Sequence, residues 1–266
     1  MFKDIIIGQY INADSVLHRL DPKIKIILTV LYVVVLFIIR GSVSYVLFAL
    51  MTLCLVLMSN IKPKVFIKGL KPLVFIIIFT AVMNLLLTPG TVMVRFWIFK
   101  ITYEGIRSAV IMFTRLVLLV TGTSLLTLTT SPLKLTDAIE TLLSPLSHIK
   151  VPAHEIAMMM SIAIRFIPTL ADETDKIQKA QTSRGADFQS GNIITRARAM
   201  IPLLVPLFIS AFRRADELAT AMDSRCYNAT IKRTKLNTSR IGKADISYAL
   251  VFICTNIIII MFGYII

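Results

Sequence analysis

The chain has 266 residues, 56% of them apolar, and its mean hydropathy of +0.78 exceeds what the core of a soluble domain requires. The composition excludes an ordinary soluble protein and predicts an integral membrane protein. The formal net charge of +14 does not indicate nucleic-acid binding, because the basic residues lie at the ends of apolar runs and in short loops, where membrane topology requires them.

Five apolar runs are candidates for membrane-spanning helices. A span requires about 20 apolar residues, and tilt or long flanking side chains allow somewhat fewer. The candidates are residues 25–39, 43–58, 73–87, 105–129 and 246–266. The first two are shorter than a typical span.

Lysine and arginine residues beside these runs predict the orientation, because they favour the cytoplasmic side of short loops. They are concentrated before the first run (Lys3, Arg19, Lys23, Lys25) and after the second (Lys62, Lys64, Lys68, Lys71). We therefore expect a cytoplasmic N-terminus. Four crossings then return the chain to the cytoplasm near Ser131, and a fifth leads the C-terminus out.

The character of the sequence changes after residue 130, where acidic residues become frequent and apolar residues recur with helical period. We expect four spans in residues 1–130, a helical cytoplasmic region in 131–243 and a last transmembrane helix in 244–266. The predicted fold class is an all-α membrane protein with about five transmembrane helices and a cytoplasmic or interfacial domain of about three amphipathic helices.

Three helices are expected in this second region. The first begins at Ser131 and Pro132, an N-cap followed by proline in the first turn, and ends near Pro145. The second runs from 152 to 183, with Pro168 as the expected kink, and the third from about 198 to 225.

The apolar parts of the two longer helices, 156–170 and 199–212, allow two interpretations. They form a hairpin buried in the bilayer, or they lie in the membrane interface. We favour the interface, because each segment is shorter than a membrane span.

The sequence contains none of the common catalytic motifs. It has no G-x-x-x-x-G-K-[ST] loop for nucleotide phosphates, no H-E-x-x-H, no G-x-S-x-G and no pair of intramembrane carboxylates. The three cysteines, Cys54, Cys226 and Cys254, have neither metal nor disulfide spacing. We therefore expect no catalytic residue, no metal site and no bound cofactor in this chain.

Two similar segments, "TSRGADF" at 182–188 and "DSRCYNA" at 223–229, close the two longer helices. The helix dipole favours a cation at these ends, and Gly185 is suited to a left-handed stop. Arg184 and Arg225 each offer a rigid fork of donors that fits carboxylates or helix-end carbonyls of another protein. Alternatively, they are ordinary helix-end arginines on the cytoplasmic side.

Three stretches carry a resemblance to a known family: "GQYINADSVLHRLDPKIKI", "IAIRFIPTLADETDKIQKAQTSRGADF" and "RARAMIPLLVPLFISAFRRADELATAMDSRCYNA". They resemble the T component of energy-coupling factor transporters, of the shared type that serves several vitamin-binding subunits. The likeness covers nearly the whole chain. Its most specific feature is a pair of Ala-Arg-Gly motifs that close two coupling helices, occupied here by Ser183-Arg184-Gly185 and Ser224-Arg225-Cys226. Cys226 departs from the glycine of the motif, which leaves the geometry of that helix end open.

The resemblance implies a non-catalytic coupling subunit in the bacterial plasma membrane. Both motifs would dock on two cytoplasmic ATP-binding-cassette subunits, which use ATP and magnesium, while a separate and exchangeable membrane subunit binds the vitamin. The residues expected to contact that subunit are Met158, Met159, Met160, Leu203, Leu204, Leu207 and Phe208. Methionine repacks easily against several partners, although packing in the core or against lipid is an equal alternative for each residue.

Two rival functions are a self-sufficient channel or secondary carrier, and a membrane-embedded enzyme. The scarcity of ionisable residues in most spans and the lack of evident inverted repeats argue against a carrier. The missing acid, histidine and metal clusters argue against an enzyme.

Arg115 lies within the fourth apolar run, where an unpaired charge is costly. It either faces inward toward Asn84 or backbone carbonyls and holds the bundle together, or it lies near the external surface with Arg107 on a long, tilted helix.

Overall fold

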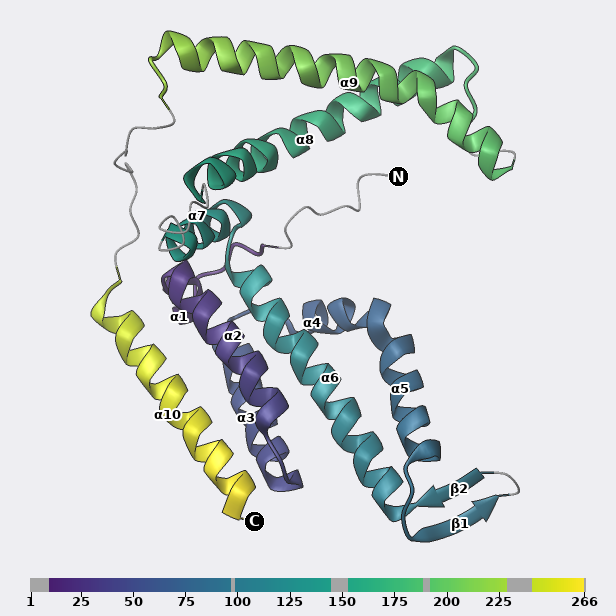
Figure 1. Ribbon diagram of the computed structural model, residues 1–266, viewed down its shortest axis with the longest axis vertical. Helices are drawn as coiled ribbons and strands as arrows, with labels where there is room; N and C mark the ends of the chain where they lie inside the picture. Colours follow the sequence, from purple (N-terminus) through teal and green to yellow (C-terminus); the bar gives the residue numbers. More distant parts are fainter. Residues whose placement is uncertain (1–9, 97–98, 145–152, 189–191, 229–240, 266) are drawn as a thin grey trace. The chain divides into compact units, whose positions relative to one another are not determined.

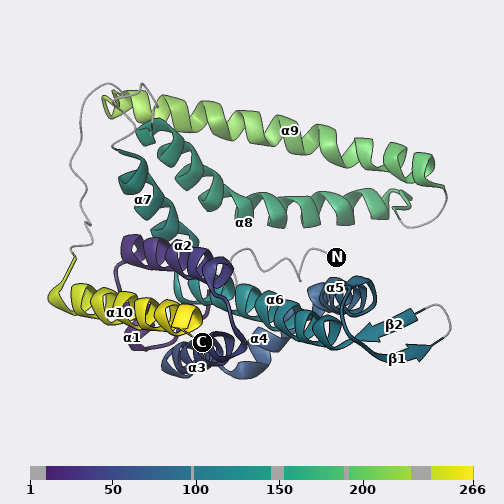
Figure 2. The same cartoon turned by 60° about the horizontal axis from the view of Figure 1, so that its bottom comes forward.

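The computed structural model describes residues 10–96, 99–144, 153–188, 192–228 and 241–265, and most of these are helical (Figures 1 and 2). The elements in chain order are α1 (Val16–Arg19), α2 (Pro22–Ile38), α3 (Ser42–Met58), α4 (Pro63–Leu70), a 3-10 turn η1 (Lys71–Leu73), α5 (Val74–Leu87), β1 (Val92–Phe96), β2 (Phe99–Thr102), α6 (Tyr103–Thr129), α7 (Pro132–Leu143), α8 (Ala153–Ser183), α9 (Ile193–Ser224) and α10 (Lys243–Ile265).

The fold class predicted from the sequence, an all-α membrane protein, is confirmed. Helix α6, helix α10 and the helical stretch of α4 and α5 are long and apolar enough to cross a membrane, and α3 is a shorter apolar helix. Helix α2, of 17 residues, overlaps the first apolar run. Among the described residues, neither α8 nor α9 meets the same length and hydropathy criterion, and the interfacial placement of 156–170 and 199–212 stays a prediction.

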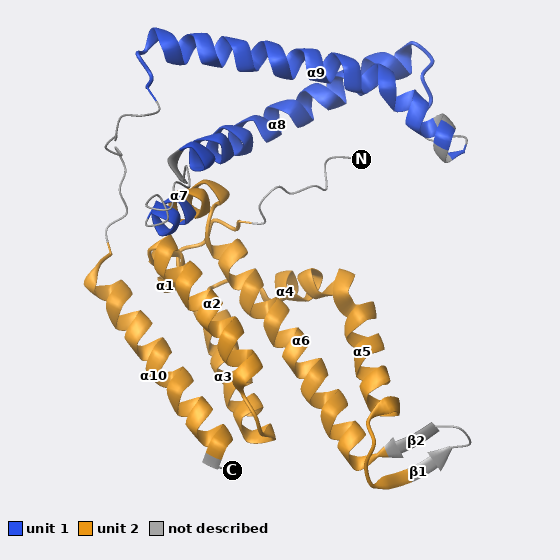
Figure 3. Cartoon of the chain, in the orientation of Figure 1, with its two compact units in different colours: residues 1–7, 139–238 blue, residues 8–138, 239–266 orange. Residues whose placement is uncertain are grey.

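The chain divides into two compact units (Figure 3). One contains the described residues of 8–138 and 239–266, and the other those of 139–238, so that the division falls within α7. The domain boundaries expected at 130/131 and 243/244 stay predictions. Three features of the sequence analysis lie outside the described residues: Lys3, the helix end near Pro145 and the last residue, Ile266.

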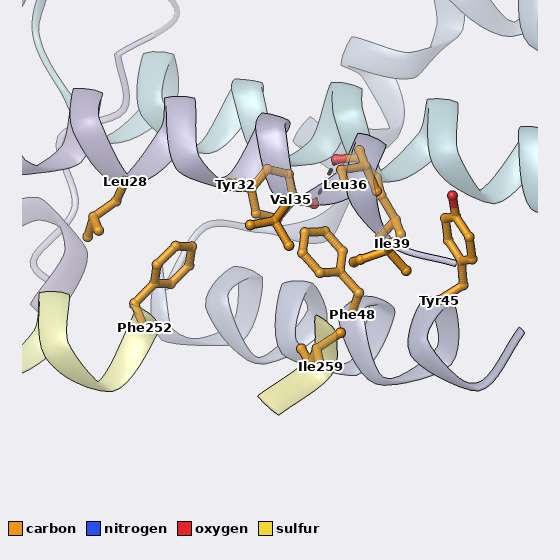
Figure 4. Packing of buried hydrophobic residues seen from close by; sticks show 10 residues of the cluster. Leu28, Tyr32, Val35, Leu36, Ile39, Tyr45, Phe48, Phe252 and Ile259 are labelled. Carbon is orange, nitrogen blue, oxygen red and sulfur yellow. Dashed lines mark hydrogen bonds between the residues drawn. The ribbon is translucent and has the colours of Figure 1, made fainter. Parts of the chain in front are cut away.

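The core of the membrane bundle lies between α2, α3, α6 and α10 (Figure 4). Tyr32 of α2 is its centre, with a ring 4.7 Å from that of Phe48 and a hydroxyl that donates to the Leu118 carbonyl at 3.0 Å. The hydroxyl also bonds Thr52 of α3 at 2.9 Å. Because lipid offers no hydrogen-bond partner, a buried tyrosine that satisfies its polar atom on two neighbouring helices fixes how they pack.

A polar junction forms where α2 and α10 begin and α6 ends. The Lys25 ammonium, 7% exposed, donates to the Thr129 carbonyl at 3.0 Å and the Thr130 hydroxyl at 3.2 Å. It therefore caps the C-terminal end of α6, where orphan carbonyls and the helix dipole favour a cation. The buried Asp245 carboxylate accepts from the backbone N–H groups of Asp21 and Gly242, which joins the first turns of α2 and α10.

The basic segment after the second span is helical, whereas the sequence analysis treated it as a loop. Residues 63–70 form α4, the turn η1 follows, and α4 and α5 run in different directions (Figure 1). Pro63 lies at the start of α4, where its missing N–H is not needed, and Pro72 lies within the turn. A short amphipathic helix thus replaces the expected connection.

The loop expected between the third and fourth spans contains a β-hairpin instead. Strands β1 and β2 pair antiparallel, with Val92 opposite Thr102 and Phe96 opposite Phe99. Thr102 then caps α6 by accepting from the Gly105 N–H at 3.0 Å. The hairpin therefore leads directly into the longest transmembrane helix.

Arg115 takes a different partner from the one considered in the sequence analysis. Its guanidinium donates to the Tyr45 hydroxyl and lies 5.6 Å from the centroids of the Phe37 and Tyr45 rings. Asn84 instead donates to the Thr80 carbonyl of its own helix. Because Tyr45 lies in the first turn of α3 and Phe37 in the last turn of α2, Arg115 lies at the level where these two short helices meet.

Gly122 of α6 lies against Tyr32 of α2, and a Cβ added at this glycine would overlap the tyrosine ring. We expect Gly122→Ala to lower the free energy of unfolding by about 1–3 kcal/mol, because the buried ring has no space to retreat. The control is Gly69→Ala in α4, whose Cβ would meet only the Ser124 hydroxyl at 3.8 Å. Thermal unfolding of the purified proteins in detergent tests this, and equal midpoints for the two variants would contradict it.

Candidate functional site

Helices α8 and α9 form a crossing pair within one unit (Figure 2). They have 31 and 32 residues, so that each is roughly 46–48 Å long at 1.5 Å per residue. Their C-terminal ends lie at opposite ends of the pair in both views (Figures 1 and 2). Helix α8 contains Pro168 and changes direction part-way along its length in Figure 2, as the kink expected at a proline requires.

A polar clasp joins the two helices and consists of Glu173 on α8 with Ser210 and Arg214 on α9. The Glu173 carboxylate accepts from the Ser210 hydroxyl at 2.5 Å and from the Arg214 guanidinium at 2.8 Å. The hydrogen bond from Ser210, together with the positive charge of Arg214, holds the pKa of Glu173 below its usual range. The carboxylate is therefore ionised at neutral pH and holds both partners.

Both long helices end in the same hydrogen-bond pattern, a Schellman motif. At the end of α8, the Gly185 N–H donates to Thr182 O and the Ala186 N–H to Gln181 O, each at 3.0 Å. At the end of α9, the Cys226 N–H donates to Asp223 O at 2.9 Å and the Tyr227 N–H to Met222 O at 3.0 Å. The two tips are thus equivalent in backbone structure although they differ in sequence.

The left-handed position of each motif is occupied by the third residue of the triplet. Gly185 has φ 90°, and Cys226 has φ 55°. The cysteine therefore replaces glycine without changing the helix end, and the geometry that the sequence left open is resolved. Because a side chain in this conformation crowds the following carbonyl, Cys226 carries a strain of about 1–2 kcal/mol.

The other two residues of each triplet also have matching environments. The hydroxyls of Ser183 and Ser224 bond the carbonyls four residues earlier, at 3.0 Å to Lys179 and 2.7 Å to Thr220. Arg184 and Arg225 are exposed, and neither guanidinium has a hydrogen bond or ion pair within the described ranges. Each tip therefore presents an unpaired cation to solvent on a well-ordered backbone.

A second surface consists of exposed apolar side chains of α9 at helical spacing. Its members are Ile201, Leu204, Val205, Phe208, Ile209 and Phe212. Phe208 is 61% and Phe212 69% exposed, which is unusual for phenylalanine in contact with water. This stripe must therefore be covered by lipid or by another protein.

The predicted contact residues divide between exposed and less exposed positions. Met159, Met160, Leu204 and Phe208 are exposed, whereas Met158 and Leu207 are half-buried. Leu203 is only 7% exposed, so it is not on the surface that a partner would meet. The contacts themselves stay a prediction.

Comparison with known proteins shows the family to which the chain belongs. Residues 13–236 match the family CbiQ, described as Cobalt transport protein. The energy-coupling factor transporter transmembrane protein EcfT of Ruminiclostridium cellulolyticum is 55% identical over 246 residues, 92% of each chain. The protein of the same name from Thermosediminibacter oceani is 52% identical over 256 residues, 96% of each chain. The chain belongs to the family of energy-coupling factor transporter transmembrane proteins.

Membership of the family confirms the resemblance noted in the sequence and identifies the chain as the membrane component of a transporter. A third relative of the same name, from Clostridium kluyveri, is 51% identical over 263 residues. That this chain is of the shared type stays a prediction. Within the described residues no group of histidine, cysteine and acidic side chains has the arrangement of a metal site.

The clasp is not predicted by the sequence. Its three residues are common polar types on long helices, and nothing in the local pattern indicates that they meet. Arg184 follows Glu173 by eleven positions, and Arg225 follows Arg214 by the same number. Each tip is therefore roughly 16 Å beyond the clasp along its own helix.

Replacing Cys226 by glycine should stabilise the end of α9. We expect Cys226→Gly to slow amide exchange of residues 226 and 227 about fivefold, because relief of the left-handed strain is worth roughly 1 kcal/mol. Hydrogen–deuterium exchange with mass spectrometry measures this. Cys226→Ala, which keeps the Cβ, is the matched control and should exchange like the wild type. Equal protection in all three proteins would show that Cys226 is not strained.

The clasp should couple Glu173 and Arg214 energetically. In a double-mutant cycle with Glu173→Gln and Arg214→Gln we expect a coupling of about 0.5–1 kcal/mol, since both side chains are partly exposed and screened. Because the pKa of Glu173 is lowered in the folded chain, this stability is present at every pH above the usual glutamate value of about 4.3. It is lost as the pH falls through the lower folded value.

The cycle is measured by chemical unfolding of the detergent-solubilised protein. Arg213, the exposed neighbour of Arg214, provides the control, and Glu173→Gln with Arg213→Gln should show no coupling. Coupling of similar size in both cycles would mean that the effect is general electrostatics rather than the clasp.

Proposed function

We propose that this chain is the coupling subunit of an energy-coupling factor transporter. It links ATP hydrolysis by two cytoplasmic ATP-binding-cassette subunits to the uptake of a vitamin or similar micronutrient. A separate, exchangeable membrane subunit binds that nutrient. The observation that carries the proposal is the pair of equivalent helix tips, each with one exposed, unpaired arginine, at opposite ends of two clasped helices.

The docking residues in this proposal are the two triplets Ser183-Arg184-Gly185 and Ser224-Arg225-Cys226. A guanidinium without an internal partner is available to carboxylates or helix-end carbonyls of another protein, and its planar fork binds two acceptors at once. The Schellman bonds and the serine hydroxyls form hydrogen bonds with the backbone at each helix end. Each helix end is therefore ordered before a partner binds. One tip would meet each ATPase subunit.

The clasp explains how movement of one tip reaches the other. The two tips lie at equal distances along their helices from Glu173 and Arg214, so displacement of either arm acts on the same point. A helix transmits displacement because its hydrogen-bond ladder resists compression. ATP-driven closure of two partner subunits would therefore change the crossing of α8 and α9.

The exposed apolar stripe of α9 is the proposed contact for the nutrient-binding subunit, together with Met159 and Met160 of α8. Exposed methionines and aromatics form adaptable surfaces, which suits exchange between several partners. Movement at the crossing would displace this surface in or at the membrane. The partner, not this chain, would determine which vitamin is transported.

The proposed location is the bacterial plasma membrane, with multiple crossings and a cytoplasmic N-terminus. The lysines and arginines before α2 and within α4 support this orientation, because they would then lie on the cytoplasmic side. ATP and magnesium would be bound by the partner ATPases, and this chain would bind no cofactor. A self-sufficient carrier would need a polar path through the bundle, and the core residues between α2, α3, α6 and α10 are predominantly apolar.

The double variant Arg184→Ala with Arg225→Ala should insert and fold normally but lose its ATPase partners. Each change removes an exposed charge and no core volume, so stability should change by less than about 0.5 kcal/mol. The control carries Arg165→Ala and Arg213→Ala, which removes one exposed arginine from each helix away from the tips.

The test is a pull-down of tagged protein from solubilised membranes, with the co-purified proteins identified and ATPase activity and uptake assayed. We expect wild type and control to retain two nucleotide-binding subunits and a small membrane protein, and the double variant to lose the ATPases. Normal ATP-driven uptake by the double variant would overturn the docking proposal. Transport by the isolated chain in liposomes would instead identify a carrier.

A further inference from the structure

A groove of about 610 Å³ lies between α3 and α6 of the membrane unit. Its walls are mostly apolar: Val46, Leu50 and Leu53 come from α3, and Ile106, Val110 and Ile111 from α6. Leu50 is 56% and Val110 59% exposed, so the groove opens toward the surroundings of the bundle rather than into its core.

One end of the groove is polar and cationic. Ser42 is the first residue of α3, Tyr103 is the first residue of α6, and Arg107 follows one turn later. From Ser42 to Leu53 the groove extends along roughly 16 Å of helix. That length corresponds to about half of a hydrocarbon core about 30 Å thick, so the polar end lies near the headgroups of one leaflet.

The positive charges at this end have no anion within the described residues. Arg107 is exposed, and neither it nor Arg115 forms an ion pair there. The nearest acidic residue in the sequence, Glu104, accepts hydrogen bonds from the Thr91 backbone and hydroxyl instead. Arg115 donates to the hydroxyl of Tyr45, which is part of the groove wall. Arg107 therefore lies in the groove wall without an anionic partner among the described residues, and Arg115 lies beside that wall through its contact with Tyr45.

We propose that this groove binds one anionic glycerophospholipid. Its phosphate contacts the Arg107 guanidinium and is attracted by the charge of Arg115, and one acyl chain lies between α3 and α6. Charge complementarity selects this occupant, because an anionic headgroup neutralises cations that are otherwise costly at the edge of the hydrocarbon. A zwitterionic lipid carries its own cation beside the phosphate and gains less.

The binding test uses the purified full-length chain, stripped of lipid and analysed by native mass spectrometry. Dioleoyl phosphatidylglycerol and dioleoyl phosphatidylcholine are added in turn to the detergent micelles. We expect one phosphatidylglycerol per chain, bound at least fivefold more strongly than phosphatidylcholine. Inorganic phosphate at the same concentration should not displace it, because it lacks the acyl chain. Equal binding of both lipids, or displacement by phosphate, would overturn the proposal.

Matched variants locate the site. Arg107→Gln should weaken phosphatidylglycerol binding at least fivefold, whereas Arg40→Gln, an exposed arginine outside the groove, should not. Leu50→Trp fills the groove and should abolish the preference, whereas Leu57→Trp, at a 70% exposed position of the same helix outside the groove, should retain it. Equal effects within either pair would show that the lipid binds elsewhere.

The assembled transporter provides an independent test. A photoreactive amino acid at position 50 should crosslink to phospholipid in membranes that contain the partner subunits. A crosslink to a protein subunit would mean that the groove is a protein interface and would overturn the proposal. Neither outcome depends on Arg184 or Arg225, so failure here leaves the proposed coupling role intact.

Discussion

The arrangement of helices in the membrane unit depends on the hydrogen bonds of the buried Lys25 ammonium. Within a bilayer, apolar helices gain little by packing against one another rather than against lipid, so their arrangement is fixed by polar contacts and close fits. Lys25 holds the end of α6 to the start of α2, and Asp245 holds the start of α10 to the same place. The shared Tyr32 hydroxyl and the close approach at Gly122 fix the same helices nearer the middle of the bundle.

Lys25 at the polar junction and the two arginines at the helix tips have similar positions but make different contacts. Each lies near the C-terminal end of a helix, where unpaired carbonyls favour a cation. Lys25 is supplied by another helix, is almost fully buried and donates to Thr129 and Thr130 at the end of α6. At the tips the Schellman bonds and serine hydroxyls already satisfy the carbonyls, so the guanidinium groups remain available to a partner. Because the backbone groups at each tip are hydrogen-bonded within the chain, the arginine side chain is free to bind another protein.

The sequence predicts this structure best where the signal is local. Apolar runs located the membrane helices, and the two Ser-Arg triplets located the helix ends. The hairpin at 92–102 and helix α4 were missed. Both segments were assigned as loops because of their charged residues, and the strand and helix propensities of their other residues were not considered. The clasp, the contact from Lys25 to the end of α6 and the Arg115–Tyr45 contact join residues 37 or more positions apart. Such pairs depend on how helices cross, which no periodicity in one sequence specifies.

The middle of α9 differs from a regular, rigid helix. Pro202 and Pro206 each remove a backbone donor from the helix, and the exposed apolar stripe covers the same turns. The clasp at Ser210 and Arg214 and the Schellman end at 222–227 lie beyond these prolines and need none of the missing bonds. Bending at 202–206 would therefore move the start of α9, with Ile201, relative to Phe208, Ile209 and Phe212, which stay with the clasped C-terminal arm. In the proposed coupling role, such a helix can bend at its prolines while its clasped arm stays rigid.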